Sequence, residues 1–380
     1  MASTQNPDMT PSLTQQYEPG EHPDWPAPSS VKGPVAWMRE NLFGSVTNTV
    51  LTLLAVYLIY KIVPALADWM FLDAVFTGES RKDCRAQGDG ACWAFISGRI
   101  QLFIYGFYPD AERWRVNLTA VLLVFALVPI LFDKVPHRGK ALIYSALYPV
   151  IAGVLLVGGI FGLEYVSTDQ FGGLMLNVII GVTGIAFSLP IGICLALGRQ
   201  SHLPIIRILS VSFIEFIRGV PLITLLFVAS SVLNYFFPPG TALDLILRVV
   251  IMATLFSSAY MAEVIRGGLA ALPQGQYEAA DSLGLDYWKS MRLIILPQAL
   301  KISIPGIVNT FIGLFKDTTL VSVIGLLDPV GMITPIRADS NWNGLVWEFY
   351  VFVALFFFAF CFCMSRYSMY LEKKLKTDNH

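Results

Sequence analysis

The chain has 380 residues, of which 55% are hydrophobic and only 14% are charged, and its mean hydropathy is +0.61. Soluble globular proteins carry about 25% charged residues, so this deficit indicates a chain embedded in lipid. The net charge of -1 leaves no basic field for nucleic acid, and 26 Phe with 8 Trp exclude a disordered polymer. Composition therefore argues against a soluble enzyme, a DNA-binding protein and a disordered tail.

The N-terminal 45 residues differ from the rest of the chain. Up to about residue 30 they are rich in Pro, Ser, Thr and Gln, a composition typical of a mobile polar tail. They contain no apolar run flanked by a cleavage site, so we expect no removable signal peptide. The sequence therefore predicts a cytoplasmic tail over residues 1–45.

Eight apolar runs are long enough to cross a bilayer core, which requires about 20 residues per helix. Six of them are clear, and two longer ones carry embedded charges and prolines. The clear runs are 46–66, 116–132, 141–161, 172–198, 245–262 and 346–365, and the other two are 208–237 and 293–316. The sequence thus predicts an all-α, polytopic membrane protein with about eight transmembrane helices.

The orientation follows from Lys and Arg, because positive charge is retained on the cytoplasmic side of short loops. With the N-terminus inside, 14 of the 26 Lys and Arg residues fall in cytoplasmic segments and 7 in exported ones. Six of those 7 lie in one long exported loop, residues 69–115, and the other five basic residues lie in or at the ends of spans. We therefore expect both termini in the cytoplasm, with residues 368–380 as a C-terminal tail.

The exported loop contains Cys84 and Cys92, which are separated by seven residues that include two glycines. In an oxidising compartment this pair can close a small disulfide ring; the alternative is two unrelated thiols. The five cysteines show no CxxC or CxxH spacing, and the four histidines are dispersed outside the spans. We therefore expect no metal site.

The run after this pair, residues 93–109, is rich in aromatic side chains and only weakly polar. Amphipathic aromatic rings are enriched at the level of the lipid headgroups. We therefore expect a helix that lies in the membrane interface, with Trp93, Tyr105 and Tyr108 at headgroup depth.

A polar to amphipathic segment, residues 272–292, lies between the sixth and seventh spans. Pro273 can open a helix, and Gly284 can end it in a left-handed turn. Asp286 can then cap a second short helix. The sequence predicts two short helices at an angle, at the cytoplasmic surface.

The first of these helices carries small side chains, Ala279 and Ala280, which we expect at its surface. Small side chains let the groove of another protein come close, and Glu278 offers a carboxylate to a basic or backbone partner. Such a pair of helices suits docking to a second protein.

The same segment carries a specific resemblance. Glu278-Ala279-Ala280, then Gly284 and then Ile294-x-Leu296-Pro297 match the EAA-xxx-G-(nine)-I-x-LP signature of ABC importer permeases at every defined position. Flanking runs at 214–227, 257–276 and 313–326 match as well. Over residues 172–367 the chain resembles the polar amino-acid permeases of the histidine and glutamine uptake type, which implies a five-helix type I importer core.

The first three spans, within residues 46–171, have no counterpart in the simplest members of that family. They are similar to the N-terminal part of the longer permease subunits of general L-amino-acid importers. The resemblance therefore implies a broad substrate range, while the function of the extra spans does not follow from the sequence.

The resemblance also implies partners, because ABC import needs ATP and this chain has no GxxxxGK[ST] motif to cradle phosphates. Its only Gly-Lys pair, Gly139-Lys140, is followed by Ala141. We expect no catalytic residue and no cofactor; ATP is bound by a cytoplasmic ABC ATPase dimer, alongside a second related permease and a periplasmic amino-acid-binding protein. The residues expected to couple to the ATPase are Gln276, Glu278, Ala279, Ala280, Asp281, Gly284, Leu296 and Pro297.

Charges inside spans deserve a functional hypothesis, since each costs about 2.5–3.5 kcal/mol at mid-membrane. Lys316 and Asp317 end the seventh span. They are either a hydrated pair at the exported interface or the groups that meet the carboxylate and ammonium of an amino acid. In the second case Thr318 and Thr319 supply hydroxyls.

Glu215 and Arg218 lie three residues apart in the fifth span, hence on one helix face. We favour a structural ion pair between the two; the alternative is a gate or pathway lining, helped by a kink at Pro221. Glu263 and Arg266 have the same spacing at the end of the sixth span, where we expect them to brace the 272–292 segment.

The sequence thus indicates a multi-pass permease subunit of a bacterial inner-membrane importer for polar or general L-amino acids. The alternatives are an ion-coupled secondary transporter or channel, and a membrane scaffold without transport activity. A stand-alone carrier has no ATPase to dock and so leaves the spaced motif unexplained. A scaffold leaves the embedded charges unexplained.

Overall fold

The computed structural model covers the whole chain and describes residues 33–377 except 133, 237 and 239–242. Most of the tail predicted over residues 1–45 lies outside the described residues, as does the end of the 368–380 segment. The last helix, α15 (Val346–Thr377), continues into that C-terminal segment.

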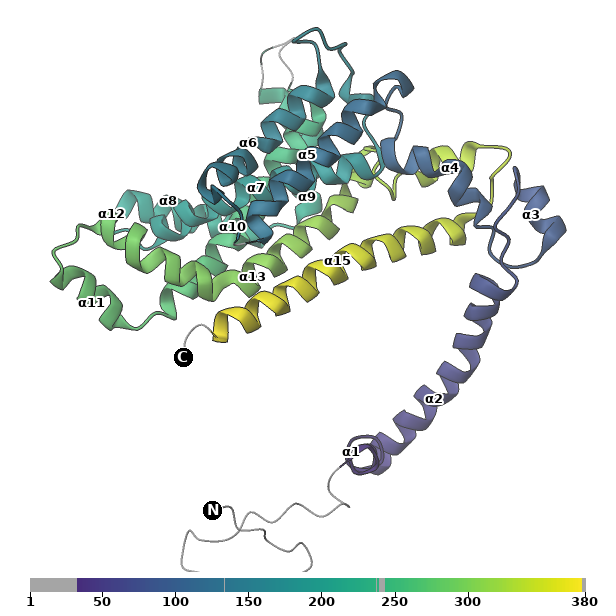
Figure 1. The fold of residues 1–380 in the computed structure, drawn as a ribbon, viewed down its shortest axis with the longest axis horizontal. Coiled ribbons are helices and arrows are strands. Elements are labelled where there is room, and N and C mark those ends of the chain that lie inside the picture. Colours follow the sequence, from purple (N-terminus) through teal and green to yellow (C-terminus); the bar gives the residue numbers. More distant parts are fainter. Residues whose placement is uncertain (1–32, 133, 237, 239–242, 378–380) are drawn as a thin grey trace, which may run out of the picture. The chain divides into compact units, whose positions relative to one another are not determined.

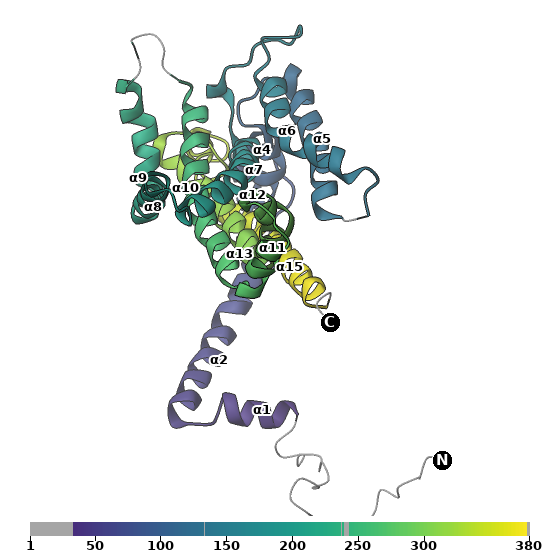
Figure 2. The same ribbon diagram turned by 90° about the vertical axis from the view of Figure 1, so that its left-hand side faces the viewer.

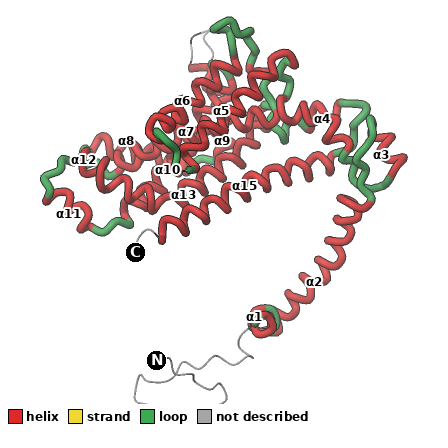
Figure 3. The backbone as a smooth tube through the Cα atoms, in the orientation of Figure 1, coloured by secondary structure: helices red, strands yellow, loops and turns green. Residues whose placement is uncertain are grey.

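The described residues form helices joined by loops and turns, with no strand among them (Figure 3). Two isolated bridges, Val75 with Cys92 and Gly106 with Phe171, are the only strand-like pairings in this part of the chain. The predicted all-α class is therefore confirmed.

Seven helical stretches of the described chain are long and apolar enough to cross a membrane. They correspond to seven of the eight predicted spans. These stretches are Val46–Leu72, Asp110–Leu131, Arg138–Val157, Gly173–Arg199, Leu245–Ala270, Tyr287–Ile324 and Val346–Lys374.

The remaining predicted span, 208–237, is not one straight helix. It consists of α8 (Pro204–Gly219) and α9 (Leu222–Phe227), the latter prolonged by a π-helical turn to Val232, and the two parts are bent by 101°. Val220 is extended, with φ -106° and ψ 130°, because the ring of Pro221 disfavours the helical conformation of the residue before it. Pro221 also has no N–H to continue the helix.

Residues up to Asp73 form a compact unit of their own. This unit contains α1 (Pro34–Asn41) and α2 (Val46–Ala67), which continues as a π-helical turn, Asp68–Leu72. The Ser45 hydroxyl caps α2 by accepting a hydrogen bond from Asn48 N at 3.1 Å. None of the described side chains of α2 is buried, as expected of an apolar span surrounded by lipid.

Residues 74–380 form the second unit, and its centre is the pair α7 (Gly173–Arg199) and α10 (Leu245–Ala270). Helix α13 (Leu296–Asp317) packs on α10, and α15 packs on α13 (Figures 1 and 2). Close approach of α7 and α10 requires a small residue at Gly192, where a Cβ would lie 2.7 Å from the Met261 Cβ. Small residues at such contacts are typical of membrane helix pairs.

Two of the additional spans, α5 (Arg113–Leu131) and α6 (Arg138–Val157), pair with each other beside α7. Tyr148 Oη donates to Thr119 O at 2.9 Å, Tyr144 Oη to Leu122 O at 2.9 Å, and Ser145 Oγ to Ala126 O at 2.6 Å. Hydroxyl donors from α6 thus reach backbone carbonyls of α5 at three successive levels, which fixes the register of the pair.

The loop predicted over 69–115 folds into α3 (Arg81–Gln87) and α4 (Ala94–Tyr105). It packs on the segment between α13 and α15, which includes α14 (Ile333–Ala338). Arg81 N donates to Asn341 O at 2.8 Å, and the rings of Phe95 and Trp342 lie 5.8 Å apart. The structure joins Cys84 to Cys92 by a disulfide, with the Cα atoms 5.7 Å apart.

The prediction of an interfacial helix over 93–109 is wrong for its C-terminal end. Tyr108 is only 1% exposed, and its hydroxyl donates to Leu156 O at 2.8 Å inside the protein core. Phe95 and Phe103 on α4 are also buried. Aromatic amphipathic patterns look alike whether the apolar face meets lipid or protein, and here α7 and the segment before α15 cover it.

Candidate functional site

The α11–α12 segment, residues 274–290, lies at the opposite end of the second unit from α3 and α4 (Figure 1). It has the two predicted helices, α11 (Gln274–Ser282) and α12 (Tyr287–Ser290). Gly284 adopts φ +66° between them, and Asp286 Oδ1 accepts a hydrogen bond from Lys289 N at 2.9 Å. The predicted left-handed turn and the predicted cap are both present.

The segment is anchored on one face and exposed on the other. Gln298 Nε2 donates to Gln276 Oε1 at 3.0 Å, and Tyr277 Oη donates to Leu269 O at 3.3 Å. Glu278 and Ala279 are exposed, but Ala280 is fully buried. The expectation that both alanines lie at the surface is therefore wrong for Ala280. Adjacent helical residues point about 100° apart, and this rotation turns Ala280 away from the exposed face that contains Glu278 and Ala279.

The exposed face also includes Asp281. The other residues predicted to couple to an ATPase, Gly284, Leu296 and Pro297, lie in the turn after α11 and at the start of α13. Gly284 forms the turn, and its N–H donates to Asp281 O at 2.9 Å. Leu296 is partly exposed and Pro297 exposed at the start of α13. A π-helical turn, Met291–Ile295, precedes them, and Pro297 cannot donate to an earlier carbonyl, so the wide turn occurs where the ordinary hydrogen-bond ladder is interrupted.

An ion-pair network lies where α7 ends and brings together three helices. Arg199 Nη1 is 2.8 Å from Glu215 Oε1 on α8 and 2.9 Å from Glu263 Oε1 on α10. The other oxygen of Glu263 is 3.1 Å from Arg266 Nε and 3.7 Å from Arg218 Nη1. A single carboxylate therefore contacts three guanidinium groups.

The favoured interpretation of Glu215 and Arg218 as an ion pair with each other is wrong. Glu215 pairs with Arg199 and Arg218 with Glu263, so each residue contacts another helix. The ion pair between Glu263 and Arg266, which lie three residues apart on α10, is present. The sequence analysis does not single out Arg199, because the predicted span ends at residue 198 and Glu215 is 16 residues further along the chain. A basic residue at the C-terminus of a helix is nevertheless a signal that a carboxylate partner is possible.

Asp317 and Thr318 line a cavity of only about 10 Å³ between α7, α9, α10 and α13. That volume holds about one water and no amino acid. Thr318 Oγ1 donates to Phe315 O at 2.7 Å and Thr319 Oγ1 to Lys316 O at 2.8 Å, so both hydroxyls keep only their acceptor capacity for a ligand. Lys316 is exposed. Within this one chain the four residues do not enclose a substrate site.

Arg248 is one of the five basic residues that lie in or at the ends of predicted spans. It is buried on α10, and its Nη1 donates to Ala229 O at 2.6 Å and Ser230 O at 3.0 Å. Those carbonyls belong to the π-helical turn Val228–Val232 after α9. Arg248 therefore fixes the far part of the broken span to α10, where a wide turn leaves carbonyls available.

Comparison with known proteins identifies this arrangement. Residues 188–377 match the family of the binding-protein-dependent transport system inner membrane component. The glutamate/glutamine/aspartate/asparagine transport system permease protein BztC of Rhodobacter capsulatus is 50% identical, and the match covers 93% of this chain and 96% of the relative. The chain belongs to this family of ABC importer permeases.

The permease has a second relative of similar extent, the inner membrane amino-acid ABC transporter permease protein YhdY of Escherichia coli. It is 50% identical over 94% of this chain and 97% of the relative. The probable glutamine ABC transporter permease protein GlnM of Bacillus subtilis is 34% identical, over 53% of this chain and 90% of the relative. A solved amino acid ABC transporter with histidines is 31% identical, covers 53% of this chain and 92% of its own, and has a TM-score of 0.48.

Family membership decides between the classes considered from the sequence. The protein is a non-catalytic, multi-pass inner-membrane subunit of an ABC importer, and an ion-coupled secondary transporter is not favoured. Permeases of this family work with an ATPase, which hydrolyses the ATP, and with a substrate-binding protein. The exposed face of the α11–α12 segment includes Glu278, Ala279 and Asp281.

Proposed function

We propose that this permease imports polar L-amino acids across a bacterial inner membrane, with both termini in the cytoplasm. Its partners are an ABC ATPase dimer, a second related permease and a periplasmic binding protein. The names of the two relatives that match nearly the whole chain support amino acids as substrates, and one of them names glutamate, glutamine, aspartate and asparagine. The distribution of Lys and Arg supports the orientation.

The observation that carries the proposal is the combination of an anchored and an exposed face in the α11–α12 segment. Hydrogen bonds of Gln276 and Tyr277 hold the segment against α13 and α10, and Ala280 is buried. Glu278 and Asp281 remain exposed on the other face. A rigid segment transmits displacement, so ATP-driven closure of an ATPase dimer bound to this face would turn the attached helices as a body.

A second permease is proposed because the candidate pathway residues lie at an incomplete site. Asp317 and Thr318 border a cavity of about 10 Å³, and Lys316 next to them is exposed. A zwitterion needs one group of each sign, and Lys316 with Asp317 provides both. A second subunit facing this surface would complete an enclosure large enough for an amino acid.

The test changes the exposed carboxylate of α11 and the turn between the two helices. Glu278→Lys reverses the charge on the docking face, and Gly284→Val introduces a β-branched residue at φ +66°. We expect recovery of the ATPase in mild detergent to fall at least about tenfold, which corresponds to about 1.4 kcal/mol. ATP-dependent uptake of labelled glutamine in proteoliposomes should fall with it, since a separate ATPase hydrolyses the ATP.

The matched control is Glu79→Lys, which reverses the charge of an exposed carboxylate on the α3–α4 side of the second unit and should leave ATPase recovery unchanged. Competition by a panel of unlabelled amino acids then defines the substrate range. Uptake that an ion gradient drives without ATP, or full ATPase recovery with both variants, would contradict the proposal.

A further inference from the structure

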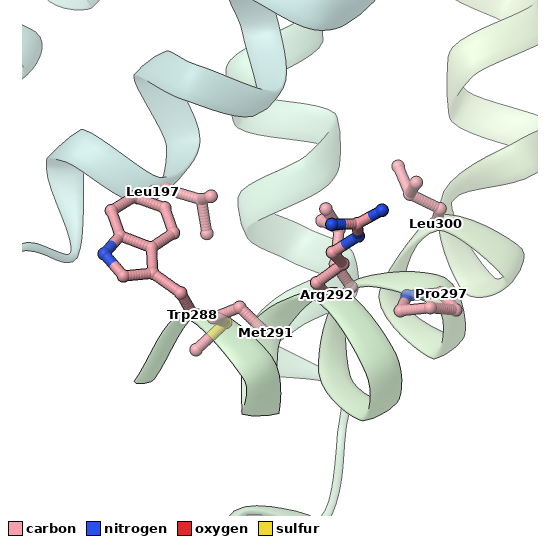
Figure 4. A pocket seen from close by; sticks show the side chains of 7 residues that line it. Leu197, Trp288, Met291, Arg292, Pro297 and Leu300 are labelled. Atoms are coloured by element: carbon pink, nitrogen blue, oxygen red, sulfur yellow. The ribbon is translucent and has the colours of Figure 1, made fainter. Parts of the chain in front are cut away.

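A cavity of about 370 Å³ opens between the end of α7 and the start of α13, beside α12. Its wall consists mainly of aliphatic side chains from three elements, Leu197 of α7, Met291 of the π-helical turn, and Leu296 and Leu300 of α13. Figure 4 shows the Trp288 indole beside Leu197 and the Arg292 side chain on the opposite side, extending toward Leu300. The cavity is thus apolar, with one cation at its edge.

That cation is available to a ligand. Arg292 is exposed, and the described residues that line the cavity include no carboxylate. The nearest acidic residue along the chain, Asp286, is already paired with Lys289, whose Nζ lies 3.0 Å from its Oδ2. A guanidinium group binds phosphate through two parallel N–H donors, so an anionic oxygen ligand is the chemistry that Arg292 favours.

The position of the cavity, at the ends of membrane-crossing helices, favours an amphipathic ligand. Leu197 lies two residues before α7 ends at Arg199, and α13 begins at Leu296, so the opening is at the level where two membrane-crossing helices end. Trp288 is 71% exposed at the same level, as aromatic residues at a membrane surface are. Free phosphate would satisfy Arg292 but would leave the aliphatic wall against water.

We propose that this cavity binds an anionic phospholipid, with the phosphate against Arg292 and the first part of an acyl chain along Leu197 and Leu300. Basic pockets between membrane helices bind such headgroups by the same combination of charge and apolar surface. The site lies against α12 through Trp288, so an occupied cavity would stabilise the position of the α11–α12 segment. The binding itself does not depend on the function proposed above.

The test uses the intact complex in nanodiscs that contain lipids with brominated acyl chains, which quench nearby tryptophan fluorescence. The signal of Trp288 is the difference between the wild type and Trp288→Phe. We expect brominated phosphatidylglycerol to quench Trp288 at a mole fraction at least about tenfold lower than brominated phosphatidylcholine does. Arg292→Gln should abolish this preference, and Arg292→Lys should retain part of it.

The matched control is Lys289→Gln, which removes a cation three residues away that does not line the cavity. It should leave the preference for phosphatidylglycerol intact. Equal quenching by both lipids in the wild type, or an unchanged preference in Arg292→Gln, would overturn the proposal. So would quenching that is absent in the complex and present only after the ATPase is removed, because the ATPase would then occupy the cavity.

Discussion

Asp317 is the residue with the strongest claim to contact the substrate. It is a partly buried carboxylate at the end of a membrane helix, and it lines a small cavity together with Thr318 and Leu226. A carboxylate in this position is costly unless a cation approaches it, and Lys316 on the neighbouring position is exposed. The ammonium group of an amino acid would supply the missing charge in a site completed by a second permease.

Asp317→Asn keeps the size of the side chain and removes its charge. A hydrogen bond to a charged group contributes about 1.5–3 kcal/mol, so we expect amino-acid uptake to fall about 10- to 150-fold. Recovery of the ATPase with the permease should be unchanged, because Asp317 is remote from the α11–α12 segment in the bundle. Asp169→Asn, an exposed carboxylate in the loop before α7, is the control. Unchanged uptake across several amino acids would refute a role for Asp317.

A second carboxyl group, that of Asp328, shows how burial raises the pKa of an acid. Asp328 lies in the segment between α13 and α14 and is fully buried. Burial raises its pKa to about 6, while the hydrogen bond from Gly331 N at 2.7 Å opposes that shift. The run Asp-Pro-Val-Gly marks a turn in the sequence, but nothing in the sequence predicts that α4 and the start of α15 pack over this segment.

At the scale of elements, apolar packing of Ile214 and Ile217 and a network of ion pairs together hold the second half of α8. The first residues of the helix, from Pro204 to Leu209, are exposed, and only its second half contacts α7 and α10. Arg199 and Glu263 hold that half in place through Glu215 and Arg218. The break at Val220 and Pro221 interrupts the helical hydrogen bonding between α8 and α9. The ion pairs fix α8 to α7 and α10, while Arg248 fixes the turn after α9 to α10.

Glu263→Gln removes the carboxylate that three arginines share. Partly exposed pairs contribute about 0.2–1 kcal/mol each, so we expect the loss of three pairs to lower the protection of α8 by about 0.6–3 kcal/mol. Amide hydrogen exchange over 204–219 should accelerate about 3- to 150-fold, with no change in α15. Arg266→Gln removes only one of the three arginines and should accelerate exchange less. Equal exchange in α8 for the wild type and Glu263→Gln would show that packing alone positions this helix.

Local signals in the sequence predict the helices and turns well, but the sequence does not predict the long-range contacts. The left-handed turn at Gly284 and the cap at Asp286 follow from the chemistry of one residue and its neighbours, so both were predictable. The break at Pro221 was suspected as a kink but its 101° angle was not, since hydropathy does not record direction. Tyr108 and Arg199 were misjudged because their partners, Leu156 and Glu263, are far along the chain.

On the largest scale, contacts between segments far apart in the sequence define one end of the second unit. Thr168, before α7, hydrogen-bonds to Asp244, which caps α10. The backbone N–H of Arg81 donates to Asn341 O, although the two residues are 260 positions apart in the sequence. These segments are the ones assigned to the exported side by their Lys and Arg content. The α11–α12 segment and the network around Glu263 belong to the other end (Figure 1).

The orientation of these two ends is open to a direct test by cysteine labelling in intact cells. In a background where Cys194, Cys361 and Cys363 are serine, Tyr165→Cys should react with an impermeant maleimide added outside the inner membrane. Gly275→Cys, exposed on α11, should react only after the membrane is permeabilised, since a docking face for an ATPase must be cytoplasmic.

Both positions are exposed, so a difference in labelling reports the side of the membrane and not burial. The serine background without an added cysteine measures the residual signal, and labelling after permeabilisation shows that each new thiol is reactive. Labelling of Gly275→Cys in intact cells would show that the orientation is the opposite of the proposed one. It would also remove the cytoplasmic ATPase from the proposed mechanism, because α11 and its exposed carboxylates would then face the compartment that contains no ATP.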